Sequence, residues 1–491
     1  MGTHQPQNDL FSYQVNLEKR VRADHPLRRI KGILDLSFVR PAVEPFYGKN
    51  GHVGTDPEIL VKMMLLLFLD NVASERELVA IIQERLDYLW FLGYGLDDEV
   101  PNHSVLSKAR ARWGSEVFCQ LFVRTVQQCV AAGLVDGRKL HIDSSLIRAD
   151  ASRDSVMQAG PQLVAAIREA YAMEEQKLDE QPQKGINTTH ISKTDPEATI
   201  ARGGNAQVSQ LSYKHHRTVD DANGVITAVR TTTGVAGDAA QLPVLIEQHQ
   251  TQTGSKVECA VGDKHYGSAQ NYRYCQSHGI RSHLGQCPGD TKGKFSVEAF
   301  VYEPEQDRYR CPAGHYLYYH NFKKEDQCVE YKIAAPALCA GCALRTQCTK
   351  SESGRTLTRP IFSDLVELGQ EQARSTAATK DRGRRKHLME GSFADARNNH
   401  GFKRARWRGL WRQRIQDWLI AAVQNLRILI RRGGKQAAGA MANAIFGLKT
   451  ASTPLIFLLL LLSTVLGKIL RQRCPAKNPC FRTFPIPQNA I

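Results

Sequence analysis

Two short apolar runs in this chain each lead directly into an aspartate, and this pattern constrains the fold more than any other feature. The run "RKLHID" ends at Asp143, and the run "SKVECAVGD" ends at Asp263. An aspartate often closes a strand in a turn. The alternative is a metal ligand, because carboxylates bind hard cations and a strand end holds them rigidly. Either run taken alone leaves both interpretations open.

The sequence around these two runs predicts a domain of mixed strands and helices over residues 137–286. "LSYKHHRTVDD" and "GVITAVRTTTG" are strand candidates on either side of "DANG", whose Asn-Gly predicts a hairpin. "DAAQLPVLIEQHQ" predicts a helix, and "GIRSHLGQC" predicts a further strand. Residues 174–205 are polar and rich in loop-forming residues, so we expect a long linker there.

Residues 15–130 predict a helical N-terminal domain. Asp56 and Pro57 are typical of a helix start, and Ser74 with Glu77 forms a capping box. The run after Asp56 is apolar nearly all round, so we expect that helix to be buried.

A third helix is expected after "VPN", capped by Asn102 or Ser104, with basic residues on its exposed side. Those residues are Lys108, Arg110 and Arg112. Basic helices of this kind often contact duplex DNA in the major groove. A helical scaffold with a solvated basic face fits the pattern equally well.

The charge balance favours a polyanionic partner. The chain has 65 Lys and Arg against 49 Asp and Glu, a net charge of +16, and a pI near 9.3. Such an excess is most often found in proteins that bind nucleic acid. Twelve cysteines in 491 residues are too few for a disulfide scaffold, and the polar N-terminus shows no signal peptide. We therefore expect a reducing, cytoplasmic setting.

Residues 287–360 contain a cluster of cysteines that predicts a structural Zn²⁺ site. Cys339 and Cys342 form a C-x2-C pair, Cys348 follows, and Cys311 begins a turn-like C-P-A-G. Four thiolates at such spacings suit tetrahedral zinc. His315 or Cys328 can replace one of the four, and a set of reduced core thiols is the alternative to a metal site.

The most basic stretch runs from residue 382 to 414 and contains eleven Lys and Arg against two acids. Within it Glu390, Phe393 and Arg397 recur at helical spacing, which places Glu390 at the margin of a buried face. Asp143, Asp263 and Glu390 together suit phosphoryl transfer, which two Mg²⁺ ions about 4 Å apart commonly support. Each of the three acids is weak support when taken alone.

Three motifs in this order resemble the DDE transposases of bacterial insertion sequences. They are "HIDSSLIRADAS", "AVGDKHYGS" and "LMEGSFADARNNHGFKRARWRG", and residues 56–114 and "SKTDPEATIARGG" also resemble family elements. The resemblance covers about residues 15–430. It implies a ribonuclease-H-like α/β core (α+β mixed), divided into residues 137–286 and 375–432, with the cysteine-rich segment as an insertion.

The resemblance also implies Asp143, Asp263 and Glu390 as the ligands of two Mg²⁺ (or Mn²⁺) ions. Many relatives have a Tyr and an Arg before the Glu and a Lys seven residues after it. Here Lys386 and Arg397 keep the basic character and the Tyr is lost. We expect phosphate contacts, with tryptophan stacking, from Lys264, Lys386, Arg397, Lys403, Arg404, Arg406, Trp407 and Arg408. His215, His216 and Asp150 are weaker candidates, and each is equally well explained as a structural residue.

The expected activity is binding of terminal inverted repeats, Mg²⁺-dependent cleavage and transfer of the freed 3′ end to target DNA. Double-stranded DNA is the expected partner, in a homodimer or larger assembly at the bacterial nucleoid, without a membrane. A nuclease that only hydrolyses DNA and a non-catalytic DNA-binding protein are the alternatives. Residues 433–491 have no counterpart in the resemblance. Their apolar run Pro454–Leu470 is shorter than the ~20 residues of a membrane helix.

Overall fold

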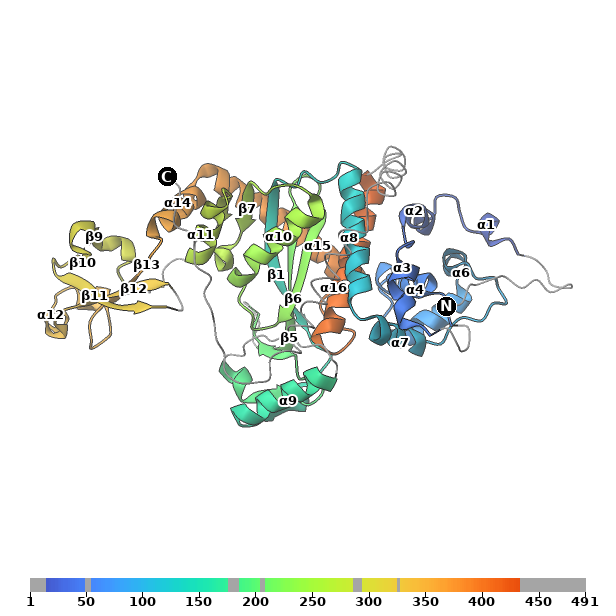
Figure 1. Cartoon of the computed structure of the whole chain (residues 1–491), viewed down its shortest axis with the longest axis horizontal. Coiled ribbons are helices and arrows are strands. Elements are labelled where there is room, and N and C mark those ends of the chain that lie inside the picture. Colours follow the sequence, from blue (N-terminus) through green and yellow to red (C-terminus); the bar gives the residue numbers. More distant parts are fainter. Residues whose placement is uncertain are drawn as a thin grey trace, which may run out of the picture. The chain divides into compact units, whose positions relative to one another are not determined.

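A six-stranded mixed sheet forms the centre of the computed structural model, which describes residues 15–48, 54–174, 185–203, 208–285, 294–324 and 327–432 (Figure 1). Its strand order is β4-β5-β1-β7-β8, and β6 pairs with β5 on the same edge as β4. Strands β5 and β6 run antiparallel to their neighbours, whereas β1, β7 and β8 are parallel. The strands are β1 (Lys139–Arg148), β4 (Thr199–Ala201), β5 (Gln210–Asp220), β6 (Ile226–Thr233), β7 (Cys259–Gly262) and β8 (Arg281–Leu284).

The order β6-β5-β1-β7-β8, in which β5 is antiparallel to the other four strands, confirms the predicted ribonuclease-H-like α/β class. The predicted hairpin joins β5 to β6, and Gly224 in it has a φ of 75°, which favours glycine. Strand β7 ends directly before Asp263, as predicted.

The expectation that the first strand ends at Asp143 is wrong. Strand β1 continues to Arg148 because β5 is long enough to pair with it throughout, from Leu140 opposite Asp220 to Arg148 opposite Ser212. Asp143 therefore lies in the middle of a strand, where pairing on one side fixes its backbone.

Helices cover both faces of this sheet (Figure 1). Because side chains alternate along a strand, Leu140 and Ile142 pack into an apolar cluster with α10 (Leu242–Thr253) and α11 (Ala269–Ser277). Side chains of Lys139, His141 and Asp143 point to the other face, which α15 (Thr376–His400) and α16 (Leu410–Arg432) cover. The helices predicted in both places are confirmed.

The polar segment 174–205 is more ordered than the predicted linker where it is described. It contains η3 (Gly185–Thr188) and β3 (His190–Ser192), and β4 joins the central sheet. Asp195 is buried and accepts a hydrogen bond from the hydroxyl of Tyr213 at 2.6 Å. The linker was predicted because the segment is polar. Polar groups such as the Asp195 carboxylate can nevertheless be buried when they have hydrogen-bond partners. Nearby elements are η2 (Arg153–Ser155), β2 (Val156–Gln158) and α9 (Pro161–Glu174).

The N-terminal region is helical, as predicted, and its two predicted caps are present. The Asp56 side chain accepts from the Glu58 amide, and the Ser74 hydroxyl accepts from the Glu77 amide at 3.2 Å. Helix α4 buries nearly its whole circumference. The elements are α1 (Leu17–Arg20), α2 (Pro26–Ile33), α3 (Val39–Val43), η1 (Glu44–Phe46), α4 (Pro57–Leu69), α5 (Glu75–Glu84), α6 (Leu86–Leu92), α7 (Ser104–Trp113) and α8 (Glu116–Ala131).

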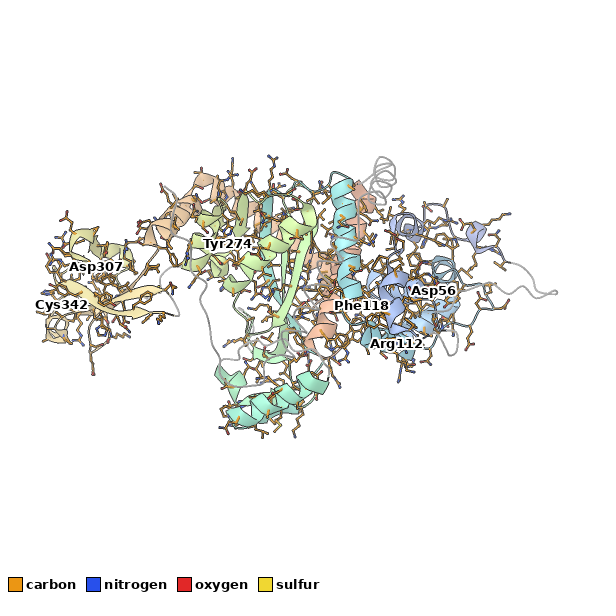
Figure 2. All side chains as sticks on the ribbon, in the orientation of Figure 1. Asp56, Arg112, Phe118, Tyr274, Asp307 and Cys342 are labelled. Atoms are coloured by element: carbon orange, nitrogen blue, oxygen red, sulfur yellow. The ribbon has the colours of Figure 1, made fainter. Side chains whose placement is uncertain are left out.

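The cysteine-rich region, in which Figure 2 labels Asp307 and Cys342, forms a separate five-stranded antiparallel sheet. Its core is a small, mainly aromatic cluster of Phe300, Tyr309, Leu317, Tyr331 and Leu357. The strands, in the order β13-β12-β11-β10-β9, are β9 (Val301–Glu303), β10 (Arg308–Arg310), β11 (Tyr316–Lys323), β12 (Cys328–Ile333) and β13 (Thr356–Pro360). The short helices are η6 (Val297–Ala299), η7 (Pro304–Gln306), α12 (Pro336–Ala340) and α13 (Arg345–Cys348), and α14 (Ser363–Arg374) returns to the core.

Within the described ranges, no helix is both long and apolar enough to cross a membrane. The tail at residues 433–491, with its apolar run Pro454–Leu470, lies outside the described residues.

Candidate active site

The two acid-bearing strands lie side by side and in register. Lys139 pairs with Cys259 and His141 with Val261 in the parallel β1–β7 ladder. Asp143 and Asp263 each lie four residues beyond the first of these pairs, so they are level with each other. The parallel pairing of β1 with β7 thus brings two carboxylates together on the face covered by α15. The Asp263 carboxylate also caps η5 (Lys264–Tyr266) by accepting from the His265 amide at 2.9 Å.

The electrostatics of Asp143 support this closeness. Burial raises the pKa of Asp143, and the charge of Asp263 raises it further, against the opposing effects of Arg385 and the Ser144 amide. Tyr266 lies three residues after Asp263, and its side chain is buried. Burial raises its pKa well above the ordinary value, and the charges of Asp143 and Asp263 contribute to that rise. Two acids that influence each other in this way suit a shared cation.

Arg385 on α15 makes an ion pair with Asp143 that the sequence did not predict. Its Nη1 donates to Asp143 Oδ2 at 2.6 Å, and its side chain is largely buried. Six other basic residues of the stretch were predicted to contact DNA, and nothing in its spacing separated this arginine from them. The signal that was available is its position on the helical face of Asp381 and Met389, which is buried.

Arg217 on β5 is a second unpredicted cation beside the acids. It stands opposite Asp143 in the β1–β5 register and is fully buried. Its Nη1 donates to Ser392 at 2.8 Å and to Gln424 at 3.0 Å. Burial lowers the pKa of Arg217 to about 10, so it remains a cation at neutral pH.

Glu390, the third predicted acid, lies on the same helix as the ion-paired Arg385. Its side chain is exposed, five residues after Arg385. Five residues correspond to about 140° around a helix and about 7.5 Å along it. Glu390 therefore projects from α15 in a different direction from Arg385, which occupies Asp143.

Three predicted phosphate contacts are exposed on the loop between α15 and α16. Lys403 donates from Nζ to the Ser145 hydroxyl at 2.5 Å, two residues along the strand from Asp143. Burial lowers the pKa of Lys403, and the positive charges of Arg397 and Arg217 lower it further. Arg404 and Arg408 pair with Asp150 at 3.2 and 3.6 Å, which explains Asp150 as a partner for these arginines.

Other predicted contacts are less accessible than expected. Arg110 is buried rather than exposed, because it pairs with Glu75 and stacks on Trp407. The Trp407 ring also packs edge-on against Phe68. Arg406 is half-buried, where it donates to backbone and side-chain oxygens of residues 71 and 72. These groups hold the N-terminal helices to the core.

The remaining candidates divide by exposure. Lys108, Arg112, Lys264, Lys386 and Arg397 have exposed side chains. His215 and His216 are completely buried. His215 contacts Asp417 at 2.9 Å, and His216 contacts Thr232 at 2.9 Å, so both histidines are structural strand residues here.

The residues present fit a divalent cation with a preference for oxygen ligands. Asp143 and Asp263 supply carboxylates, and the site is flanked by cations that suit the phosphate of a substrate. The ion pair with Arg385 shows that a positive charge can be accommodated beside the Asp143 carboxylate. The four predicted zinc ligands Cys311, Cys339, Cys342 and Cys348 lie elsewhere, around one pocket of the insertion.

Family comparisons agree with the resemblance. Residues 15–112 match the model of a transposase domain (DUF772), and residues 310–430 match the model of a transposase DDE domain. Two stretches of the chain thus match models of transposase domains, and the second model is of the DDE class. The second match includes residues 310–360 of the cysteine-rich segment, α15 and most of α16.

Similar solved structures are also transposases. A piggyBac transposase synaptic complex with hairpin DNA has 10% identity and a TM-score of 0.33, covering 93% of this chain and 87% of that chain. A Mos1 transposase paired-end complex with the left transposon end has 12% identity and a TM-score of 0.16, covering 74% and 86%. TM-scores this low do not establish a detailed structural correspondence. No curated protein matches the chain.

Proposed function

We propose that this protein cuts the terminal inverted repeats of an insertion sequence and joins the freed 3′ ends to target DNA. One observation carries the proposal: two aspartates, level on adjacent parallel strands of a ribonuclease-H-like sheet, lie beside a group of cations. Carboxylates alone suit many hydrolases. Cations packed around them suit a phosphodiester substrate, whose negative charge they would offset.

In the proposal, Asp143 and Asp263 hold two Mg²⁺ (or Mn²⁺) ions. When bound, these ions would activate the attacking hydroxyl and stabilise the leaving oxygen. Arg385 would release the Asp143 carboxylate for this purpose and remain within reach of a substrate phosphate. Lys403 and Arg397, whose charges influence each other, would hold the DNA backbone next to the scissile bond.

Glu390 is retained as the third acid on the strength of the resemblance. It lies about one and a half turns beyond Arg385 on α15. In the proposal, α15 turns about its axis when DNA or metal binds, because Arg385 occupies Asp143 in this structure. The proposal therefore includes a rearrangement of α15 that exchanges Arg385 for Glu390 beside Asp143.

Specific binding of DNA ends is assigned to the exposed basic residues of two regions. Lys108 and Arg112 lie on α7, and Lys403, Arg404 and Arg408 lie on the loop after α15. Since two ends must be joined, the proposal requires at least two active sites and hence a dimer or larger assembly on DNA.

The test is a cleavage-and-joining assay with labelled inverted-repeat DNA and Mg²⁺. The proposal predicts joined product from the wild type, none from Asp143→Asn or Glu390→Gln, and unchanged DNA binding by both variants. Asp364→Asn is the matched control, because the Asp364 side chain is 96% exposed and far along the chain from the acids.

Each alternative function predicts a different result. A nuclease that only hydrolyses would cut random duplex as fast as inverted repeats and join nothing. A non-catalytic DNA-binding protein would shift DNA without metal and would be indifferent to Asp143→Asn. Joining that survives Glu390→Gln but not Asp143→Asn would remove Glu390 from the active site.

A further inference from the structure

We propose that Cys311, Cys339, Cys342 and Cys348 bind one Zn²⁺ ion that stabilises the inserted five-stranded sheet. The inference is independent of the proposed function, because the pocket they line shares no residue with the acid site. The ion would be structural, since four protein thiolates leave no open coordination position for a substrate.

The four cysteines come from three separate segments and meet around one pocket. Cys311 follows β10, Cys339 lies in α12, Cys342 follows that helix, and Cys348 ends α13. All four are free thiols. The four side chains therefore line a single pocket although they come from different parts of the chain.

The backbone around the pocket is arranged to support thiolates. The turn from Cys311 to His315 is closed by the Cys311 amide donating to the His315 carbonyl at 2.8 Å, with Gly314 at a φ of 84°. In return, the His315 amide donates to Cys311 Sγ at 3.3 Å. An amide that points at a sulfur favours its ionised form.

Gly354 shows how closely the chain packs around Cys339. A Cβ atom at this position would lie 3.1 Å from Cys339 Sγ and 2.8 Å from Ile333 Cγ2, and the φ of 85° also disfavours any other residue. A glycine is thus needed where the backbone passes over the sulfur.

The sequence left open whether Cys328 or His315 replaces one of the four cysteines as a zinc ligand, and the structure favours the four cysteines. Ile333 at one end of β12 lines the pocket, whereas Cys328 begins the same strand and does not. Five residues of strand place Cys328 roughly 16 Å away from that end. His315 also lines the pocket, and its backbone forms hydrogen bonds with Cys311. The four sulfurs are enough to complete a tetrahedral site without its side chain.

No three of the four sulfurs lie within 4.8 Å of one another in this structure. Zn–S bonds of about 2.3 Å hold tetrahedral sulfurs about 3.8 Å apart. Among the described residues, three ligand atoms within 4.8 Å of one another occur only at Cys259, His283 and Asp381. All four pocket cysteines lie on turns or short helices, where rotation about χ1 carries a sulfur from one staggered position to another.

The tighter cluster of Cys259, His283 and Asp381 is not the metal site. Lys139 Nζ lies 2.9 Å from Asp381 Oδ1 and already supplies the positive charge. Burial raises the pKa of Cys259 to about 12, which keeps it a neutral thiol. Zinc is inferred at the insertion because that sheet has only a small core, and small units with little core commonly depend on a metal.

The experiment measures metal content of the full chain, purified without a polyhistidine tag or chelator, by plasma mass spectrometry. We expect one zinc per wild-type chain and about tenfold less in Cys342→Ser, because each thiolate contributes strongly to zinc affinity. Cys328→Ser is the matched control and should retain the full content. His315→Ala should retain it as well.

A second measurement guards against misfolding of the serine variant. Cys342→His keeps a zinc ligand, so it should restore zinc, and its Co²⁺-substituted form should show weaker thiolate-to-metal absorption than the wild type. The inference is overturned if the wild type contains no zinc, or if Cys328→Ser loses as much as Cys342→Ser. DNA joining is not part of this readout, so its failure would not affect the result.

Discussion

The reactive side chains of the two sheets have opposite effects on the stability of the fold. The central sheet is covered by helices on both faces, and its paired aspartates add repulsion rather than cohesion. The inserted sheet has one small, mainly aromatic cluster, and its cysteines gather where that cluster ends. Where a core is large, charged groups can be reserved for chemistry. Where it is small, reactive groups are needed to hold the fold together.

The strongest test of this contrast is Asp263→Asn. We expect strand joining to fall by about 1,000-fold or more, since several kcal/mol of charge stabilisation are lost and each 1.4 kcal/mol is tenfold. The midpoint of denaturant unfolding should stay the same or rise, because the repulsion with Asp143 is relieved. Joining assays and circular dichroism measure the two effects. A variant that loses activity and stability together would contradict the distinction.

The inserted sheet should respond in the opposite way to removal of its metal. Treatment with a chelator is expected to expose residues 294–360 to protease, because zinc binding there is part of the folding free energy. The central sheet should stay protected. Mass spectrometry of early cleavage sites distinguishes the two regions. Equal protection of the insertion before and after chelation would show that the aromatic cluster suffices.

A third cluster tests whether charges in the central sheet can also be structural. Asp381 fastens α15 to the sheet by accepting from Lys139 at 2.9 Å and from His283 at 2.6 Å. Asp381→Asn should lower the free energy of unfolding by about 1.5–3 kcal/mol, the worth of hydrogen bonds to a charged group. Denaturant unfolding at neutral pH measures this loss.

The same substitution has a predictable pH dependence. Burial alone would raise the pKa of Asp381, but hydrogen bonds from Lys139 and His283 outweigh it and lower the pKa below 3.8. A lowered pKa means that the stabilisation is complete above the unfolded-state value and is lost as pH falls through the folded one. The difference between wild type and Asp381→Asn should therefore be constant near neutral pH and shrink in strong acid. A difference that grows in acid would contradict the ion pair.

Sequence patterns predicted the elements of the core well, because hydrophobic period and turn chemistry are local. The "DANG" hairpin, the Asp56 and Ser74 caps and the strand before Asp263 all follow from residues within a few positions. The full length of β1 was missed because it depends on pairing with β5, seventy residues later. The order in segment 185–201 was missed for the same reason.

The candidate site was predictable in part. Asp143 and Asp263 share a strand-end pattern, and the parallel register that makes them level could be anticipated from the fold class. The ion pair of Arg385 could not, since it depends on the rotation of α15 about its axis. The burial of Arg110 could not be predicted from the sequence either. Its partner Glu75 lies on another helix, and Trp407, on which it stacks, lies nearly 300 residues away.

The smallest expected effect concerns Arg385, which occupies the Asp143 carboxylate when no metal is bound. In Arg385→Gln the Asp143 carboxylate loses a cation that competes with metal. The Mn²⁺ concentration that gives half-maximal binding should fall by about tenfold, since a charge-assisted hydrogen bond is worth about 1.5 kcal/mol or more. Isothermal titration calorimetry on the DNA-free protein measures this directly.

Arg384→Gln is the matched control for this last prediction. Arg384 is the neighbouring residue on α15, and it pairs with Asp221 at 2.5 Å rather than with Asp143. Its loss should leave Mn²⁺ affinity unchanged, because no metal-binding carboxylate is released. If both variants bind Mn²⁺ equally tightly, the effect comes from net charge alone. Arg385 would then not be the group that occupies Asp143 before metal binds.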